Sequence, residues 1–340
     1  MKIYILIAVF LSAVGAISAD KPAVPVLNHV LRAVPAPGAV ALDGDLKDWD
    51  MSGAIVIADS VEQPRKLVRV AAMYDKDGFY LALQFKDRTP MVNHIDPVVS
   101  PGRAWCGDCV QLRINTGPYP DKAVLKPYQI LHVDAYWYTD GKRPAAYVVY
   151  GDFSPGGNTE KTISEAEGQG MKSAYRKDDD GYGYVQELFL GWKLLRPEEG
   201  AFKAGDSMHM AVEPMWGDPQ YNDHPASRVT DLLNPLREER DMIWANPMAW
   251  GTVEFMPKGN QEPSETAMMW DGLVRKFNEL KDDKPFAEDK EQAAPDRPCL
   301  SEKGEIEKLL NFWYSAKTAA GNIGDFYDNV WVVTRERKAL

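Results

Sequence analysis

Short runs of alternating apolar and polar residues, separated by turn signals, fill the middle of the chain. Residues 66–74 and 79–85 are two such runs, and the Asp75-Lys76-Asp77-Gly78 turn between them predicts a β-hairpin. Further strands are predicted over residues 110–115, 129–139, 145–150, 171–176, 184–190, 208–214 and 249–255. Many short strands with few helical stretches predict a mostly-β chain whose main domain, residues 41–256, is an antiparallel β-sandwich.

The pattern changes after Pro257, where the spacing of apolar residues becomes helical. Residues 266–280 place apolar side chains three and four positions apart, and a second helical stretch begins at Ser301 after a charged connector. We therefore expect a helical C-terminal extension over residues 257–340. These helices are too few to form a core alone, so we expect them to pack on the sandwich or on a protein partner.

The N-terminal residues have the pattern of a signal peptide. A positive start at Lys2 is followed by the apolar run Ile3–Val14 and by small residues up to Ala19. We expect residues 1–19 to direct secretion or export to the periplasm and then to be removed. An uncleaved anchor is the alternative, although the run is shorter than the about 20 residues of a membrane span. No later segment is apolar enough to span a membrane, and residues 20–40, with four prolines, are expected to be a linker.

Charge and aromatic content narrow the range of partners. The formal net charge is −11 at pH 7, and the Lys and Arg residues form no basic stripe. Phosphate binding needs clustered cations, so nucleic acid is not an expected partner. The chain has 10 Trp and 15 Tyr, which are enough to fill a core and also to line a binding surface.

The three cysteines form no complete metal or haem motif. Cys106 and Cys109 have the C-x2-C spacing of redox and zinc sites, but no second pair completes a zinc site. Val110 stands where covalent haem attachment requires His. A local disulfide, a disulfide to Cys299 and free thiols are the alternatives.

No catalytic constellation is recognisable in the sequence. It contains neither G-x-S-x-G nor H-E-x-x-H. A glycoside hydrolase needs two opposed carboxylates, and Glu187 has no nominated partner. The pairs His94/Asp96 and His132/Asp134 each span two residues, so each pair would share a strand face and together they would offer a metal site. We expect a binding module rather than an enzyme.

Three segments carry a resemblance to one superfamily. Residues 42–49 (LDGDLKDW) contain D-G-x-x-x-D-W, and residues 105–112 (WCGDCVQL) are similar to W-x-x-D-x-V-E/Q. Residues 183–192 (GYVQELFLGW) resemble G-Y-x-x-E-x-x-I-P-W, with Leu and Gly replacing Ile and Pro. In this order they resemble the DOMON-like β-sandwich superfamily, which includes the family 9 carbohydrate-binding modules. The resemblance implies a sandwich of the jelly-roll type with a structural Glu187.

The same resemblance implies an exported, non-catalytic carbohydrate-binding protein, often found beside a catalytic partner. A sugar packs its apolar face on an aromatic ring, and fixed polar groups bond its hydroxyls. In the family an aromatic and a polar residue six positions apart face the ligand, as Trp105 and Gln111 would here. Arg113, two residues further on, would share that strand face. Trp216 or Trp137 would supply the opposite wall.

Core packing is the competing role for every tryptophan, and we assign it to Trp49 and Trp192. The family also often carries structural calcium, for which Asp43 and Asp45 are candidate oxygen donors. Carboxylates that only form turns are the alternative.

A related branch of the superfamily suggests a different ligand, b-type haem. This branch includes the gamma subunit of ethylbenzene dehydrogenase, and it holds the iron between a Met and a Lys. Residues 85–91 (FKDRTPM) are similar to its W-x-D-x-T strand end with a following Met. That resemblance implies Met91 and Lys172 as haem ligands in an electron-transfer subunit. The segment 184–190 lacks the basic residue that the haem branch carries in its equivalent strand.

Overall fold

A computed structural model describes residues 26–119, 125–126, 128–151, 159–164, 166–217, 219, 226–236 and 245–282. Its strands are β1 (Val30–Pro35), β2 (Ile55–Ala58), β3 (Leu67–Tyr74), β4 (Gly78–Lys86), β5 (Cys109–Asn115), β6 (Ile130–Tyr138), β7 (Arg143–Gly151), β8 (Thr159–Ser164), β9 (Met171–Lys177), β10 (Gly183–Gly191), β11 (Ser207–Trp216), β12 (Ser227–Arg228) and β13 (Gly251–Phe255). Its helices are the short 3-10 turns η2 (Leu46–Asp48), η3 (Met51–Gly53), η4 (Pro101–Cys106) and η6 (Pro247–Ala249), and α2 (Trp192–Leu195), α3 (Glu265–Met268) and α4 (Trp270–Leu280).

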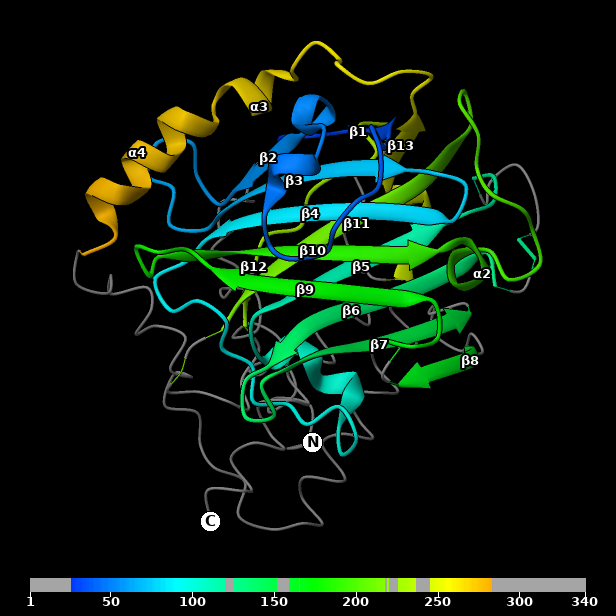
Figure 1. Cartoon of the computed structure of the whole chain (residues 1–340), viewed down its shortest axis with the longest axis horizontal. Helices are drawn as coiled ribbons and strands as arrows, with labels where there is room; N and C mark the ends of the chain where they lie inside the picture. The colour runs from blue at the N-terminus through cyan, green and yellow to red at the C-terminus, as the bar shows by residue number, and fades with distance from the viewer. Residues whose placement is uncertain are drawn as a thin grey trace, which may run out of the picture.

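The strands form one sheet that folds over on itself. In the described part of the chain the order is β8-β7-β6-β5-β11-β13-β1-β3-β4-β10-β9, with β2 on β3 and β12 on β11. Figure 1 shows β3, β4, β10 and β9 running side by side. The mostly-β, sandwich-like prediction is confirmed. The pairing is mixed rather than purely antiparallel, because β1 runs parallel to both β13 and β3.

The main core lies between the two folded halves of the sheet. Along β5, Val110, Leu112 and Ile114 all face inward and are fully buried, as the strand period of two requires. The same core receives Leu81 and Leu83 from β4 in the other half. Burying a side chain of this size contributes roughly 1.5–3 kcal/mol, so the pattern that predicted the strands also supplies the main stabilising term.

The expected linker over residues 20–40 is wrong in its second half, because Val30–Pro35 is strand β1. This strand lies between β13 and β3, and it buries Leu31 and Ala33 in the main core. Pro35 is its last residue, where a missing N–H costs little, so the proline is compatible with the strand. Residues 1–19, the expected signal peptide, lie outside the described residues. Within those described, no helix has the length and apolar character needed to cross a membrane.

The predicted helix over residues 266–280 is present as α3 and α4. Trp270, Leu273 and Phe277 bury the inner face of α4 against Val56 and Leu67 on the outer faces of β2 and β3. Figure 1 shows both helices near β2. The start of the C-terminal extension therefore packs on the sandwich, and residues 283–340 lie outside the described range.

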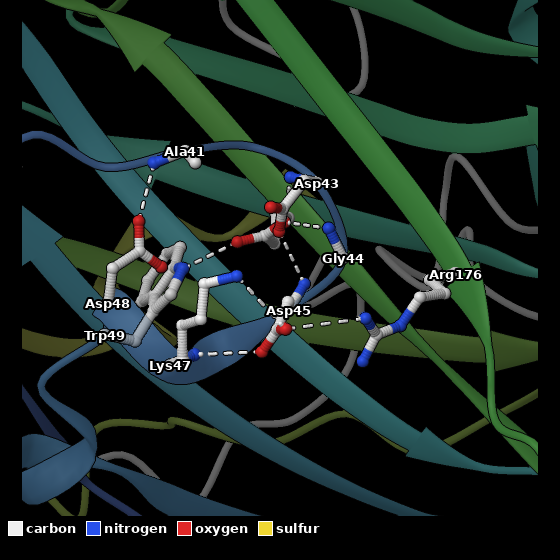
Figure 2. Close-up of polar contacts among 9 residues, drawn as sticks. Ala41, Asp43, Gly44, Asp45, Lys47, Asp48, Trp49 and Arg176 are labelled. Carbon is white, nitrogen blue, oxygen red and sulfur yellow. Dashed lines mark hydrogen bonds and ion pairs between the residues drawn. The ribbon is translucent and has the colours of Figure 1, made fainter.

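Two of the three resemblance segments meet at Glu187. The backbone N–H groups of Asp43 and Gly44 donate to Glu187 Oε2, and Trp49 Nε1 donates to its Oε1 at 2.6 Å. Gly44 has φ +77°, and a Cβ there would lie 2.4 Å from the Cβ of Arg176, so the tight turn requires glycine. Figure 2 shows this turn and its polar contacts. The D-G-x-x-x-D-W segment is therefore fixed to β10 by a buried carboxylate.

Candidate functional site

Polar side chains form a row across the outer face of three neighbouring strands. Gln111 on β5 is opposite Asp134 on β6 and opposite Glu213 on β11. These positions alternate with the core residues of the same strands, so they face away from the main core. Arg113 follows on the same face of β5. All four side chains are buried.

These four side chains form one hydrogen-bonded network. Gln111 Nε2 donates to Asp134 Oδ1 at 2.8 Å, and Arg113 Nη2 donates to Gln111 Oε1 at 2.8 Å. Arg113 also lies 3.5 Å from Asp134 and 3.4 Å from Glu213. The expectation that Gln111 and Arg113 share a strand face is confirmed, and the register adds two carboxylates to them.

The network is electrically balanced and retains one unused donor. Arg228, with its side chain 55% exposed, lies 3.7 Å from Glu213 Oε1, so two guanidinium groups face two carboxylates. Burial raises the pKa of Asp134 to about 6, against the opposing effect of the Arg113 guanidinium. Among the described residues, the buried Nε of Arg113 has no hydrogen-bond partner. An unmet donor of this kind costs about 1–3 kcal/mol.

Trp105 lies on this same outer face, at the start of β5. It belongs to η4, and it packs half-buried against a cluster that includes Cys109, Tyr136 and Met215. That apolar row is next to the row of Gln111, about 7 Å further along the strands. The Trp105 carbonyl accepts the N–H of Ala226, two residues before Arg228, so the segment that carries Arg228 is hydrogen-bonded to the loop that carries Trp105.

Asp108 holds η4 in this position. Its carboxylate accepts the N–H of Val92 at 2.7 Å and the N–H of Gly217 at 2.6 Å. A Cβ on Gly107 would lie 2.6 Å from the Val92 carbonyl oxygen, so the approach of the two segments requires glycine there. The Asp of the W-x-x-D pattern therefore positions the loop that carries Trp105.

The predicted ligand-binding roles of the two other tryptophans, Trp216 and Trp137, do not agree with the structure. Trp216 is buried in the main core, where its Nε1 donates to the Lys86 carbonyl at 3.1 Å and its ring meets Phe85 edge-on. Trp137 also faces the core side of its strand, and it contacts Tyr175 of β9 with ring centroids 5.5 Å apart. Because side chains alternate along a strand, neither ring joins Gln111 on the outer face.

The proposed haem ligands are not brought together. Met91 is in the main core, beyond the end of β4 where Lys86 pairs with Gly183. Lys172 is exposed over the outward ring of Phe189, with which it pairs in the sheet. Six residues of β10 separate these levels, roughly 20 Å at strand spacing, and the side chains lie on opposite faces. The two side chains therefore cannot bind one iron. Strand register separates them, and a sequence motif carries no information about register.

The calcium candidates have other partners. Asp43 accepts the N–H of Asp45, and Asp45 forms ion pairs with Lys47 at 3.4 Å and with Arg176 at 3.7 Å (Figure 2). A cation beside Asp45 would be repelled by both bases, so these residues do not fit a calcium site. Within the described ranges no group of His, Cys, Asp or Glu is arranged to hold a metal ion. Cys106 and Cys109 are buried and are not joined to each other by a disulfide, and Cys299 lies outside these ranges.

Asp134 and Glu213 are the site residues that sequence reasoning missed as ligand contacts. The sequence indicates Asp134 only as a metal-ligand candidate with His132. Both carboxylates are charged residues at alternate positions within otherwise apolar strands, and that signal is visible in the sequence. Strand register, which brings them to Gln111, is not.

No protein-family model matches the chain, and no curated protein matches it. Solved structures do. The chain is similar to a family 9 carbohydrate-binding module. That module, from Caldicellulosiruptor kristjanssonii in complex with glucose, has a TM-score of 0.45 and 12% identity, over 69% of this chain and 99% of the module. A second structure, of a family 9 module from the same organism with cellotriose, has the same score and identity, over 70% of this chain and 96% of the module.

Proposed function

We propose that this protein is a non-catalytic carbohydrate-binding protein whose sugar binds at the outer face of β5, β6 and β11. The observation that carries the proposal is the network of Gln111, Arg113, Asp134 and Glu213, which Arg228 borders at its exposed rim. Sugar hydroxyls require fixed donors and acceptors, and this network offers both. Its balanced charge suits a neutral ligand.

The sugar ring would lie at the rim of the network, where the side chains are accessible. Trp105 is half-buried and Arg228 is mostly exposed, whereas Gln111 and Arg113 are almost covered. The ring face would pack on Trp105, with hydroxyls directed toward Arg228 and the network. The three resemblance segments support the same ligand class. The N-terminal pattern supports export.

A binding role also fits the contacts of the two carboxylates. Asp134 and Glu213 both lie beside Arg113, which would hold them as fixed hydrogen-bond acceptors. A hydrolase would instead need one carboxyl free to give a proton and another free to accept one. We therefore assign them to ligand orientation.

Calorimetry of the exported chain with a panel of soluble glycans tests the proposal. Trp105→Ala is expected to weaken binding at least tenfold, about 1.4 kcal/mol. Gln111→Met, which keeps the volume but removes the amide, should do the same. Trp216→Phe is the matched control, because it changes a core ring and should leave the affinity unchanged. If no glycan binds, or if Trp105→Ala and Gln111→Met bind as the wild type does, the proposal is wrong.

A further inference from the structure

A hollow lies on the outer face of the other half of the sandwich, between η3, β3 and the helices α3 and α4. Its volume is about 330 Å³. Its lining residues are Met51, Ser52, Arg69, Pro263, Ala267, Met268, Trp270 and Asp271. Figure 1 shows α3 and α4 near β2, which pairs with β3. The volume is in the range of small-molecule sites.

Arg69 is the unusual residue of this hollow. Its neighbours on the same face of β3, Leu67 and Ala71, both belong to apolar clusters. The guanidinium is half-buried, and its Nε is buried without a hydrogen-bond partner. No described residue forms a hydrogen bond or ion pair with Arg69. Burial lowers the pKa of Arg69, and the nearby Asp271 opposes that shift.

A partly desolvated cation with no ion-pair partner among the described residues lowers the stability of the fold. Arg69 also makes no contribution to the packing of α4 on the sheet. That packing rests on Trp270, Leu273 and Phe277, which bury apolar surface without help from Arg69. A guanidinium presents a planar set of donors that matches a carboxylate in a bidentate arrangement. The feature is therefore explained better by a ligand than by the fold.

We propose that this hollow binds a small organic carboxylate whose acid group pairs with Arg69. The apolar body of the ligand would lie against Met51 and Met268, the second of which is 68% exposed at the rim. Asp271 adds a negative charge beside the cation, so a phosphate-like polyanion fits less well than a monoanion. The same carboxylate of Asp271 would accept a hydroxyl or ammonium donor, which points to a 2-hydroxy or 2-amino acid.

Titration of the full chain with 2-hydroxyisocaproate and with leucine tests this site, with 2-hydroxyisocaproamide as the uncharged control. We expect at least one acid to bind with a Kd below about 10 mM, and the amide to bind at least tenfold more weakly. Arg69→Gln should weaken the acid at least tenfold. Arg176→Gln, an exposed arginine on the outer face of the same half of the sheet, should leave it unchanged.

Met268→Asp provides a second variant that does not disturb the core, because the side chain is exposed. It adds a negative charge at the rim and should also weaken the acid. The proposal is overturned if neither acid binds, if the amide binds as well as its acid, or if Arg69→Gln retains wild-type affinity. Thermal unfolding of Arg69→Gln should show no loss of stability, since the guanidinium has no hydrogen-bond or ion-pair partner among the described residues.

Discussion

Glu187 explains why two distant sequence motifs occur together. Its carboxylate accepts the N–H groups of Asp43 and Gly44 and the indole N–H of Trp49. The turn therefore supplies the hydrogen bonds of the buried carboxylate, and the carboxylate fixes the turn to β10. Burial raises the pKa of Glu187, while those three donors favour the ionised form. The structural role that the resemblance implies for this residue thus has a physical cause.

Glu187→Gln is expected to destabilise the fold by about 1–3 kcal/mol, because the amide NH2 must face at least one of the three donors. Urea unfolding measures the change. Asp179→Asn is the matched control, since Asp179 is exposed in a turn and should change stability by less than about 0.5 kcal/mol. Equal stability of Glu187→Gln and wild type would show that the turn does not depend on this carboxylate.

At the level of single residues, only part of the site can be predicted from the sequence. The period of a strand is enough to place Gln111 and Arg113 on one face, and the structure agrees. The same period does not say which face of β11 carries Trp216, because that depends on which neighbours cover it. The Asp134 and Glu213 contacts depend on register across three strands, which one sequence cannot provide.

At the level of elements, β1 is the clearest departure from the sequence prediction. Prolines at positions 35 and 37 favoured a linker, yet Leu31, Ala33 and Val34 are fully buried. The strand joins β13 to β3 and so makes the sheet continuous. Long-range pairing outweighs a local proline signal when the proline stands at the end of the strand.

The loss of stability in Leu31→Ala distinguishes a buried strand from a linker at this segment. A buried strand residue is expected to cost about 2–5 kcal/mol on truncation, whereas a linker residue would cost little. Val30→Ala is the control, because Val30 is next to it in β1 and is 41% exposed. The midpoint of chemical unfolding gives the answer. A loss below about 0.5 kcal/mol for Leu31→Ala would show that the segment behaves as a linker and not as a buried strand.

A second element-level feature is the junction of the β4 end, the η4 loop and the β11 end. Asp108 ties Val92 to Gly217, and the buried carboxyl of Asp87 lies beside it. Burial raises the pKa of Asp87 to about 6, and burial with the neighbouring Asp87 raises that of Asp108 well above its usual value. Both shifts favour the protonated form of these carboxyls in the folded chain.

This junction predicts a pH dependence of stability. The pKa of Asp87 in the folded chain lies above its ordinary value of 3.8, so the folded state binds the proton more tightly. The contribution of this carboxyl to the free energy of unfolding is fully present below about pH 4, and it is lost as the pH rises through about 6. Asp87→Asn should reduce that fall by roughly 1–3 kcal/mol in urea unfolding from pH 4 to pH 7. Part of the fall should persist, because burial also raises the pKa of Asp134 and of Asp231 to about 6. An unchanged slope in the variant would contradict the prediction.

For the whole molecule, pattern and composition were sufficient for the fold class and for most strands. Strand periodicity predicted β5 and β10 to within one residue at either end, and the helix after Pro263 was also predicted. The hollow around Arg69 was not, because it forms where the C-terminal helices cross the outer face of β3, and the sequence does not show which strand they cover.

The two proposed sites occupy outer faces on opposite halves of the sandwich, with the main core between them. Facing sheets pack about 10 Å apart, and no described side chain lines both sites, so the sites should be energetically independent. Trp105→Ala should leave the affinity for 2-hydroxyisocaproate or leucine unchanged, and Arg69→Gln should leave glycan affinity unchanged. Calorimetry of both single variants and the double variant measures this. A coupling above about 0.5 kcal/mol between the two changes would mean that the halves of the sheet shift together on binding, and that the core between them is not rigid.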